Sequence, residues 1–251
     1  MSASVFLVEP ELMSDSGVGS LLNLPKSVEH HIRVMRIESD ELIELVDGCG
    51  KRMSGTVNLE GLFEVGSVLL DPLPALRIDV AQALIKGDRL ENSLDMLTQV
   101  GVTGLIPWIA DHSVVKWNKE KSEKQLVKWG NVTRAATEQS RRSWTPVIHE
   151  PMTSQALAQR FSDYDHVVVL SESGTPYSPN IYSGSLLLIV GPEGGVSPHE
   201  HELFANAVSL RLGINVFRSE TAGVVGVAYL FSTSGEWDSE SGGSVQGLTN
   251  A

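Results

Sequence analysis

A glycine-rich segment in the C-terminal half has the clearest pattern for chemistry. Residues 191–195 read Gly-Pro-Glu-Gly-Gly, between the apolar run 186–190 and Ser197. Glycines between a buried strand and a helix let the backbone approach a ligand closely. The segment lacks the Gly-Lys-Ser/Thr ending of a P-loop and the G-x-G-x-x-G spacing of a dinucleotide fold. Because Glu193 would repel a pyrophosphate, the pattern indicates either a ligand with positive charge or N–H donors, or a tight turn without a ligand.

A second segment with polar groups among apolar ones covers residues 212–223. It reads Leu-Gly-Ile-Asn-Val-Phe-Arg-Ser-Glu-Thr-Ala-Gly, so a strand end, a loop and a helix start follow one another closely. Arg218, Glu220 and Thr221 are available there for binding. The alternative is that Ser219 or Thr221 only caps the helix that follows.

Positive charge gathers between His112 and Arg142, although the whole chain has a formal net charge of −12. This stretch contains eight Lys or Arg residues against three Glu, and phosphate contacts require such local positive charge. Arg residues interleaved with aromatic side chains are typical of RNA contacts, and Trp117, Trp129 and Trp144 lie in this stretch. The alternative is a solvated helix whose Trp side chains pack inward.

The N-terminal part of the chain carries a His pair within a basic segment. Residues 30–36 read His-His-Ile-Arg-Val-Met-Arg, which could form an RNA-facing edge of a β domain. A His pair alone is more typical of a surface or capping feature than of a metal site, and no third ligand is close in the sequence. The segment therefore predicts no metal.

The hydrophobic pattern of the first 70 residues predicts short strands with turn glycines between them, as in a small β-barrel or sandwich. The expected strands cover residues 5–8, 41–46, 51–57 and 65–70. Asp71-Pro-Leu-Pro74 is a stiff, extended link, and we expect a domain boundary there.

From Leu76 onward the pattern alternates between strands and helices, which predicts an α/β fold with a mostly parallel sheet. The expected strands cover residues 77–84, 104–108, 166–170, 185–190 and 207–212. Four helices are expected. The first begins with a capping box at 88–91, and the second runs from 119 to about 141. The third begins at Ser197 with Pro198 and Glu200, and the fourth runs from Ser219 or Thr221 through Phe231. Ligands of such sheets bind at the carboxyl ends of the strands.

Composition limits the classes of protein that fit. Cys49 is the only cysteine, so an internal disulfide and a Cys-rich zinc site are excluded. The first ten residues lack the features of a signal peptide, and no segment approaches the roughly 20 apolar residues that span a bilayer. We expect a cytoplasmic protein with no membrane and no metal. The Ser- and Gly-rich residues after Ser232 predict a disordered tail.

Taken together, these segments resemble the 16S ribosomal RNA (uracil-N3) methyltransferase family, RsmE, of the SPOUT class, from about Val5 to Leu230. The resemblance rests on the order and spacing of eight pieces. They are His30 to Arg36, Asp47 to Gly50, Gln82 to Arg89, Gly101 to Pro107, Ser113 to Lys116, Gln139 to Arg142, Gly191 to Gly195 and Arg218 to Ala222.

The resemblance implies a PUA-like β-barrel RNA-binding domain over residues 1–72 and a SPOUT α/β methyltransferase domain with a deep trefoil knot over 73–232, followed by the tail, 233–251. It implies S-adenosylmethionine as the cofactor and a homodimer that builds each active site. The implied partner is 16S ribosomal RNA within the 30S subunit, methylated at N3 of a uracil.

The resemblance also implies roles for particular residues. The expected cofactor-binding residues are Leu170, Glu172, Ile189, Gly191, Glu193, Gly194, Leu212, Gly213, Phe217, Arg218 and Thr221. The expected RNA-binding residues are His30, Arg33, Arg36, Lys86, Arg89, Lys116, Gln139 and Arg142. Arg142 is also the expected catalytic group, because the uracil anion formed at N3 needs a cationic partner. Glu193 is expected to shape its loop or meet N–H donors rather than act at sulfur.

The chain departs from the family pattern at several positions. Ser4 or Val5 stands where the family has Arg, Met96 where it has Lys, Gln99 where it has Glu, and Ile214-Asn215 where it has Pro-Arg. Three alternatives therefore stay open. They are a SPOUT methyltransferase acting on another RNA, a non-catalytic RNA-binding homologue, and a nucleotide-binding α/β protein without an RNA partner.

Overall fold

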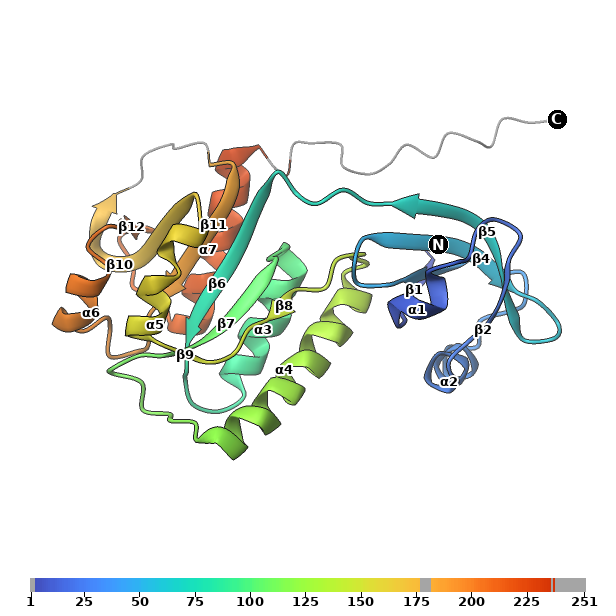
Figure 1. Ribbon diagram of the computed structural model, residues 1–251, viewed down its shortest axis with the longest axis horizontal. Helices are drawn as coiled ribbons and strands as arrows, with labels where there is room; N and C mark the ends of the chain where they lie inside the picture. The colour runs from blue at the N-terminus through green and yellow to red at the C-terminus, as the bar shows by residue number, and fades with distance from the viewer. Residues whose placement is uncertain (1–2, 177–181, 236, 238–251) are drawn as a thin grey trace. The chain divides into compact units, whose positions relative to one another are not determined.

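The computed structural model describes residues 3–176, 182–235 and 237 (Figure 1). These residues divide into two compact units. Unit 1 holds 3–73 and 137–145, and unit 2 holds the remaining described residues from 74 onward. The consecutive division expected from the sequence did not anticipate that residues 137–145 return to unit 1. Of the expected tail, 233–251, all but 233–235 and 237 lies outside the described residues.

Unit 1 is built on a five-stranded sheet with the order β1-β3-β4-β5-β2, and β1 and β2 are its edges. The strands are β1 (Ser4–Leu7), β2 (Leu21–Asn23), β3 (Ile43–Val46), β4 (Lys51–Val57) and β5 (Leu62–Leu70). β1 runs parallel to β3, and the other neighbours are antiparallel. Leu45, Met53 and Phe63 are fully buried at the centre of its core. The four strands expected from the sequence are confirmed, whereas the short β2 was not predicted.

Unit 1 also contains two helices that the sequence pattern did not predict, α1 (Pro10–Met13) and α2 (Lys26–Met35). Residues 30–36, expected as an RNA-facing edge of the β domain, lie on α2 and at its end, and whether they face RNA stays a prediction. Arg36 ends the helix in the left-handed conformation, with φ of 57°, and its N–H bonds back to the carbonyl of Arg33. Val28 is the one buried residue of α2, so the apolar stripe of this helix is narrow. A narrow stripe gives only a weak helical pattern in the sequence.

Unit 2 is an α/β unit with an all-parallel sheet, as the sequence predicted. The strand order is β12-β10-β11-β6-β7-β8, and β9 also pairs with β7. The strands are β6 (Leu76–Ala83), β7 (Gly104–Ile109), β8 (Val147–Ile148), β9 (Met152–Thr153), β10 (His166–Pro176), β11 (Gly184–Val190) and β12 (Val208–Arg211). β8 and β9 were not predicted, because two residues are too few for a periodic pattern.

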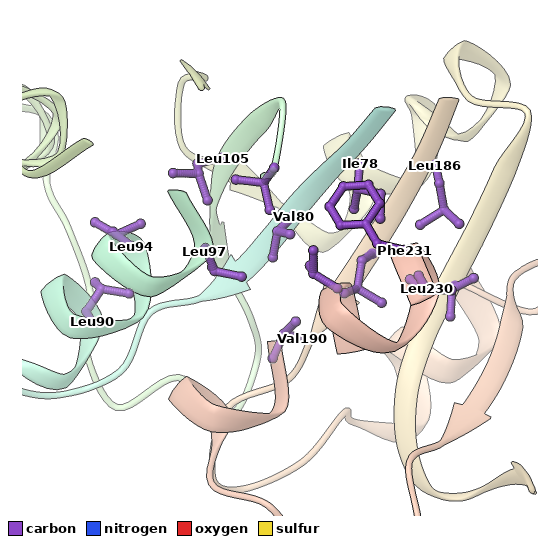
Figure 2. Packing of buried hydrophobic residues seen from close by; sticks show 14 of the residues in the cluster. Ile78, Val80, Leu90, Leu94, Leu97, Leu105, Leu186, Val190, Leu230 and Phe231 are labelled. Atoms are coloured by element: carbon purple, nitrogen blue, oxygen red, sulfur yellow. The ribbon is translucent and has the colours of Figure 1, made fainter. Parts of the chain in front are cut away.

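Helices cover both faces of this sheet. On one face α3 (Arg89–Val100) and α7 (Ser219–Ser234) pack on β6 and β11, and Figure 2 shows Leu97 of α3 beside Val80 and Phe231 of α7 beside Ile78. On the other face α5 (Ser154–Gln159), the 3-10 turn η1 (Phe161–Asp163) and α6 (Pro198–Leu203) enclose a second cluster of buried residues. Successive side chains of a strand point to opposite faces of the sheet, and here both faces are covered by helices. The side chains on both faces are therefore apolar, which explains the continuous hydrophobic runs in the sequence.

The long helix α4 (Lys119–Gln139) carries the basic stretch. Trp129 is fully buried in unit 2 and packs edge-to-face against Trp117, with ring centroids 5.8 Å apart. For Trp129 the inward-packing alternative is therefore confirmed, and its interpretation as an RNA-stacking aromatic is wrong, whereas Trp117 is only partly buried.

The two expected capping boxes have different outcomes. Ser197 Oγ accepts from the N–H of Glu200, and the Glu200 carboxylate accepts from the N–H of Ser197, so the box at α6 is confirmed. The box expected at 88–91 is wrong. Asp88 already has helical dihedrals and makes no side-chain cap bond, while the carboxylate of Glu91 pairs with Lys128 instead.

Among the described residues, no helix is both long and apolar enough to span a bilayer. Within the same ranges, no three His, Cys, Asp or Glu side chains gather as a metal site requires.

Asp79 on β6 is the acceptor at the centre of a polar cluster in unit 2. Tyr164 Oη donates to it at 2.8 Å and Thr103 Oγ1 at 3.0 Å, and His149 Nε2 lies 3.6 Å from the carboxylate. Burial by itself raises the pKa of Asp79, but the hydrogen bonds from these three side chains and the charge of His149 bring it below its ordinary value. The cluster therefore stabilises the ionised carboxylate in the folded state.

Replacing Asp79 by Asn should lower the free energy of unfolding at pH 7 by roughly 1–3 kcal/mol, because the neighbouring donors lose a charged acceptor. A carboxylate with a lowered folded-state pKa stabilises the fold above its unfolded-state pKa of about 4, and this stabilisation is lost as the pH falls through the folded-state value. The free energies of unfolding of wild type and Asp79→Asn, measured in urea, should therefore differ by this full amount at pH 7 and by less below about pH 4. Asp163→Asn, at an exposed pair with Arg160, is the control and should cost less than about 1 kcal/mol. A difference that does not vary with pH would contradict this origin.

Candidate functional site

A cavity of about 980 Å³ lies at the carboxyl ends of β11 and β12 and beside the irregular part of β10. Its walls are residues 170–173, 190–196 and 210–219, with His201 and Ala222. The three strands are neighbours in the sheet, so loops far apart in the sequence meet at one edge. The volume suits a small organic ligand.

The start of the glycine loop is fixed by the first turn of α7. Ser219 Oγ donates to the carbonyl of Gly191 at 2.6 Å and accepts from Gln82 Nε2 at 2.9 Å. The N-cap of α7 is Arg218, without a side-chain cap bond, so the alternative that Ser219 or Thr221 serves only as the cap is wrong. Ser219 connects the glycine loop to the buried end of β6.

The end of the glycine loop is fixed by the turn that follows β7. His112 Nδ1 lies 2.9 Å from the carbonyl oxygen of Gly194 and 3.1 Å from that of Gly195, so Nδ1 carries the proton in these bonds. A Cβ on Gly194 would lie 3.0 Å from His112 Cβ, which explains a glycine at this position. The neighbouring Asp111 accepts from Ser197 Oγ at 2.6 Å. The helix start after the loop is thereby tied to the same turn.

The Glu200 carboxylate extends this second attachment into the protein interior. It is fully buried, and it accepts from the N–H of Asp111 at 2.8 Å and from Ser154 Oγ at 2.6 Å. Ser154 Oγ in turn accepts from Trp108 Nε1 at 3.0 Å. A buried carboxylate is tolerated only with such a full set of donors. Glu200, expected only as a capping residue, is therefore also the bridge between α6, α5 and the end of β7.

Glu193 at the tip of the loop lies beside a cation of the protein itself, Arg89. Its Oε1 lies 3.4 Å from Arg89 Nη1, which is also 4.0 Å from Glu220 Oε1. The Arg89 and Glu193 side chains are nearly half exposed, so this pair contributes at most about 1 kcal/mol. Arg89, predicted as an RNA contact, thus lies beside the glycine loop.

Most of the residues predicted to bind the cofactor come together around the cavity. The predicted residues that line it are Leu170, Glu172, Gly191, Glu193, Gly194, Leu212, Gly213, Phe217 and Arg218. The side chain of Ile189 is instead fully buried in the sheet core, and Thr221 is exposed and outside the lining. Sequence reasoning missed Arg211 and His201, which also line the cavity. Arg211 is the last residue of β12, so its place at a strand end was the available signal.

The residues predicted to bind RNA divide between the two units. His30, Arg33, Arg36 and Gln139 are exposed in unit 1, and Lys86, Arg89 and Lys116 are exposed in unit 2. Arg142 belongs to unit 1 and is half-buried. Burial lowers the pKa of Arg142 to about 10, so its guanidinium is still charged at neutral pH.

The segment that contains Arg142 is attached to the sheet of unit 1. Trp144 Nε1 donates to the carbonyl of Asp71 at 3.1 Å, and Glu138 Oε1 accepts from the N–H of Leu7 at 2.9 Å. The N–H of Gly50 donates to the carbonyl of Ser143, and a Cβ on Gly50 would clash with the Trp144 ring at 2.4 Å. Trp144 is therefore an anchor within unit 1, and the turn at 47–50 is shaped to receive it.

Comparison with known proteins identifies the family of the chain. A family model described as RNA methyltransferase domain matches residues 71–231. The ribosomal RNA small subunit methyltransferase E of Mycobacterium bovis is 32% identical over 251 residues, which cover 95% of each chain.

Two solved structures are similar over nearly the whole chain. The ribosomal RNA small subunit methyltransferase E of Neisseria gonorrhoeae, bound to S-adenosyl methionine, has 25% identity and a TM-score of 0.80, and 92% of this chain and 98% of that one are covered. A Legionella pneumophila protein described as a methyltransferase, in complex with the cofactor SAM, has 26% identity and a TM-score of 0.81 over the same shares. The chain belongs to the RNA methyltransferase family that includes ribosomal RNA small subunit methyltransferase E.

Proposed function

We propose that this protein transfers the methyl group of S-adenosylmethionine to N3 of a uracil in 16S ribosomal RNA of the small subunit. The observation that carries the proposal is the cavity at the carboxyl ends of β11 and β12, whose glycine loop is held at both ends. Similarity over 92–98% of both chains to a methyltransferase E bound to S-adenosyl methionine supports the ligand.

The lining of the cavity fits S-adenosylmethionine, which carries an adenine ring, a sulfonium, an ammonium and a carboxylate. Leu170 and Phe217 offer apolar surface for the adenine. The carboxylates of Glu172 and Glu193 suit the ammonium group and the N–H donors of the ligand, and Arg211 suits its carboxylate. When bound, this cofactor supplies an electrophilic methyl group.

The protein's own contribution is positioning and charge stabilisation. Methylation at N3 requires the imide proton to leave, the new N–C bond to form and the C–S bond to break. A cationic donor at the uracil anion lowers this barrier, and we assign that role to Arg142, whose guanidinium keeps its proton below pH of about 10.

The proposal also includes finer features that the family resemblance implies. They are a trefoil knot in the α/β unit, a PUA-like role for unit 1, a homodimer, a cytoplasmic location and the assembled 30S subunit as the substrate. The exposed basic side chains of α2, with His30, Arg33 and Arg36, are the proposed RNA contacts of unit 1.

Gly194→Ala should weaken S-adenosylmethionine binding about tenfold or more, because the new methyl group displaces His112 from the loop carbonyls. Isothermal titration calorimetry measures this directly. The matched control is Gly130→Ala on α4, where a Cβ meets nothing within 4 Å. This control should leave binding unchanged and stabilise the helix by up to about 1 kcal/mol. Wild-type protein that binds no S-adenosylmethionine would overturn the proposed cofactor, and unaltered binding by Gly194→Ala would overturn the role of the loop.

Arg142→Ala should reduce methyl transfer by at least about 100-fold, because the uracil anion loses its cationic partner, while S-adenosylmethionine binding stays within about twofold. The assay is transfer of a radioactive methyl group to 30S subunits from a strain that lacks the modification, with nucleoside analysis of the product. Arg77→Ala removes one exposed charge outside the proposed sites and is the control.

The outcomes separate the proposed function from its alternatives. A product methylated at another position identifies a methyltransferase with a different target, and binding of RNA without transfer identifies a non-catalytic homologue. Arg142→Ala protein that methylates at the wild-type rate would contradict the catalytic assignment even where the wild type forms the expected product.

A further inference from the structure

Gln82 is a buried amide in the apolar face of the sheet that packs against α3 and α7. It is fully buried at the end of β6, among Val80, Leu84 and Val190. A buried amide without hydrogen bonds is costly, so its partners must be accounted for. Gln82 Nε2 donates to Ser219 Oγ at 2.9 Å and to the carbonyl of Ala83 at 3.3 Å.

The other end of the Gln82 amide is also satisfied. Ser93 Oγ of α3 lies 3.5 Å from both Gln82 Oε1 and the carbonyl of Glu220, and these two acceptors share its single proton. A Cβ on Gly223 of α7 would lie only 3.3 Å from Gln82 Oε1. Both α3 and α7 therefore come close to the Gln82 amide, and Gly223 lets α7 do so.

The direction of the chain of hydrogen bonds follows from the chemistry of its members. The carbonyl of Gly191 cannot donate, so the 2.6 Å bond to it uses the single proton of Ser219 Oγ. The oxygen of Ser219 must then accept from Gln82, which places Nε2 toward Ser219 and Oε1 toward Ser93. Because Gln82 Nε2 can only donate to Ser219 Oγ, the hydroxyl proton of Ser219 remains available for the carbonyl of Gly191.

We propose that Gln82 is a positioning residue, which through Ser219 fixes the Gly191 carbonyl and thereby the shape of the S-adenosylmethionine-binding loop. This inference rests on the proposed function. Gln82 is absent from the cavity lining, whereas Ser219 and Gly191 are part of it. The His112 contacts hold the far end of the loop, and Gln82 holds the near end. A loop that is ordered before the ligand arrives loses less entropy on binding.

A substitution that reverses the hydrogen bond tests the proposal more sharply than one that removes it. In Gln82→Glu, the ionised carboxylate only accepts, so Ser219 turns its proton toward residue 82 and releases Gly191. The protonated carboxyl group donates, so it restores the original direction. Burial raises the pKa of a carboxyl group toward neutrality, which brings this switch into an accessible pH range.

The measurement is the dissociation constant of S-adenosylmethionine for full-length wild type and variants between pH 5 and 9.5, by calorimetry. The ratio of variant to wild type cancels the pH dependence that the ligand and the unchanged part of the protein contribute. For Gln82→Glu we expect a ratio of about ten at high pH, because one hydrogen bond is lost. At low pH the ratio should return to within about twofold of one. For Gln82→Met, which neither donates nor accepts strongly, the ratio should stay near ten throughout.

Two further variants separate positioning from general stability. Ser93→Ala removes the bond on the other side of the amide and should lower the melting temperature while it leaves the dissociation constant within about twofold. Ser219→Ala should weaken binding as much as Gln82→Met does, whereas Ser219→Thr, which keeps a hydroxyl, should recover it. These Ser219 variants decide the question if Gln82→Glu does not fold.

The outcomes distinguish this inference from the proposed function. Wild-type protein that does not bind S-adenosylmethionine overturns both. Wild-type binding combined with a Gln82→Glu ratio that is constant across the pH range, or with a Ser219→Ala variant that binds as tightly as wild type, overturns the role of Gln82 and leaves the proposed function intact.

Discussion

The attachment of the glycine loop at both of its ends is the interaction on which the site depends. The carbonyl of Gly191 is bound by Ser219, and the carbonyls of Gly194 and Gly195 by His112. The loop itself has few side chains to pack, so its conformation must come from partners supplied by other segments. These partners are the ends of β6 and β7 and the start of α7, and the sheet order brings all of them next to β11 or close to it. A chain that made a different sheet order would lack them.

The sheet gives these attachments a rigid base. Both faces of unit 2 are covered, and fully buried residues such as Val80 and Leu188 on one face and Ile106 and Ile189 on the other hold the strands in place. Close-packed interiors resist small displacements. The carboxyl ends of β11 and β12 are therefore fixed relative to each other, and the cavity between their loops is largely preformed rather than assembled by the ligand.

Buried polar groups in this protein both specify the fold and shape the site. Glu200 is fully buried and joins α5, α6 and the end of β7, and Gln82 joins β6, α3 and α7. Each would be destabilising without its partners, so each requires particular residues on the neighbouring elements. This requirement fixes one register between helices and sheet, whereas apolar contacts alone would tolerate several. The same bonds that specify the fold also shape the walls of the site.

The sequence by itself determined the α/β class, most strands of both units, the long basic helix and the capping box at Ser197, because these depend on local periodicity and local hydrogen bonds. It also indicated the glycine loop and nine residues of the cavity lining, since strand ends and the family pattern mark them.

Only the tertiary structure decided which residues hold that loop. His112 lies 82 residues from Gly194, and Gln82 lies 137 residues from Ser219, so no local pattern connects them. Tertiary contacts likewise bury Trp129, pair Glu91 with Lys128 instead of the expected cap, and place residues 137–145 in unit 1. In each case a long-range partner outcompeted a local one, because burial and charge favoured it more than the local bond did.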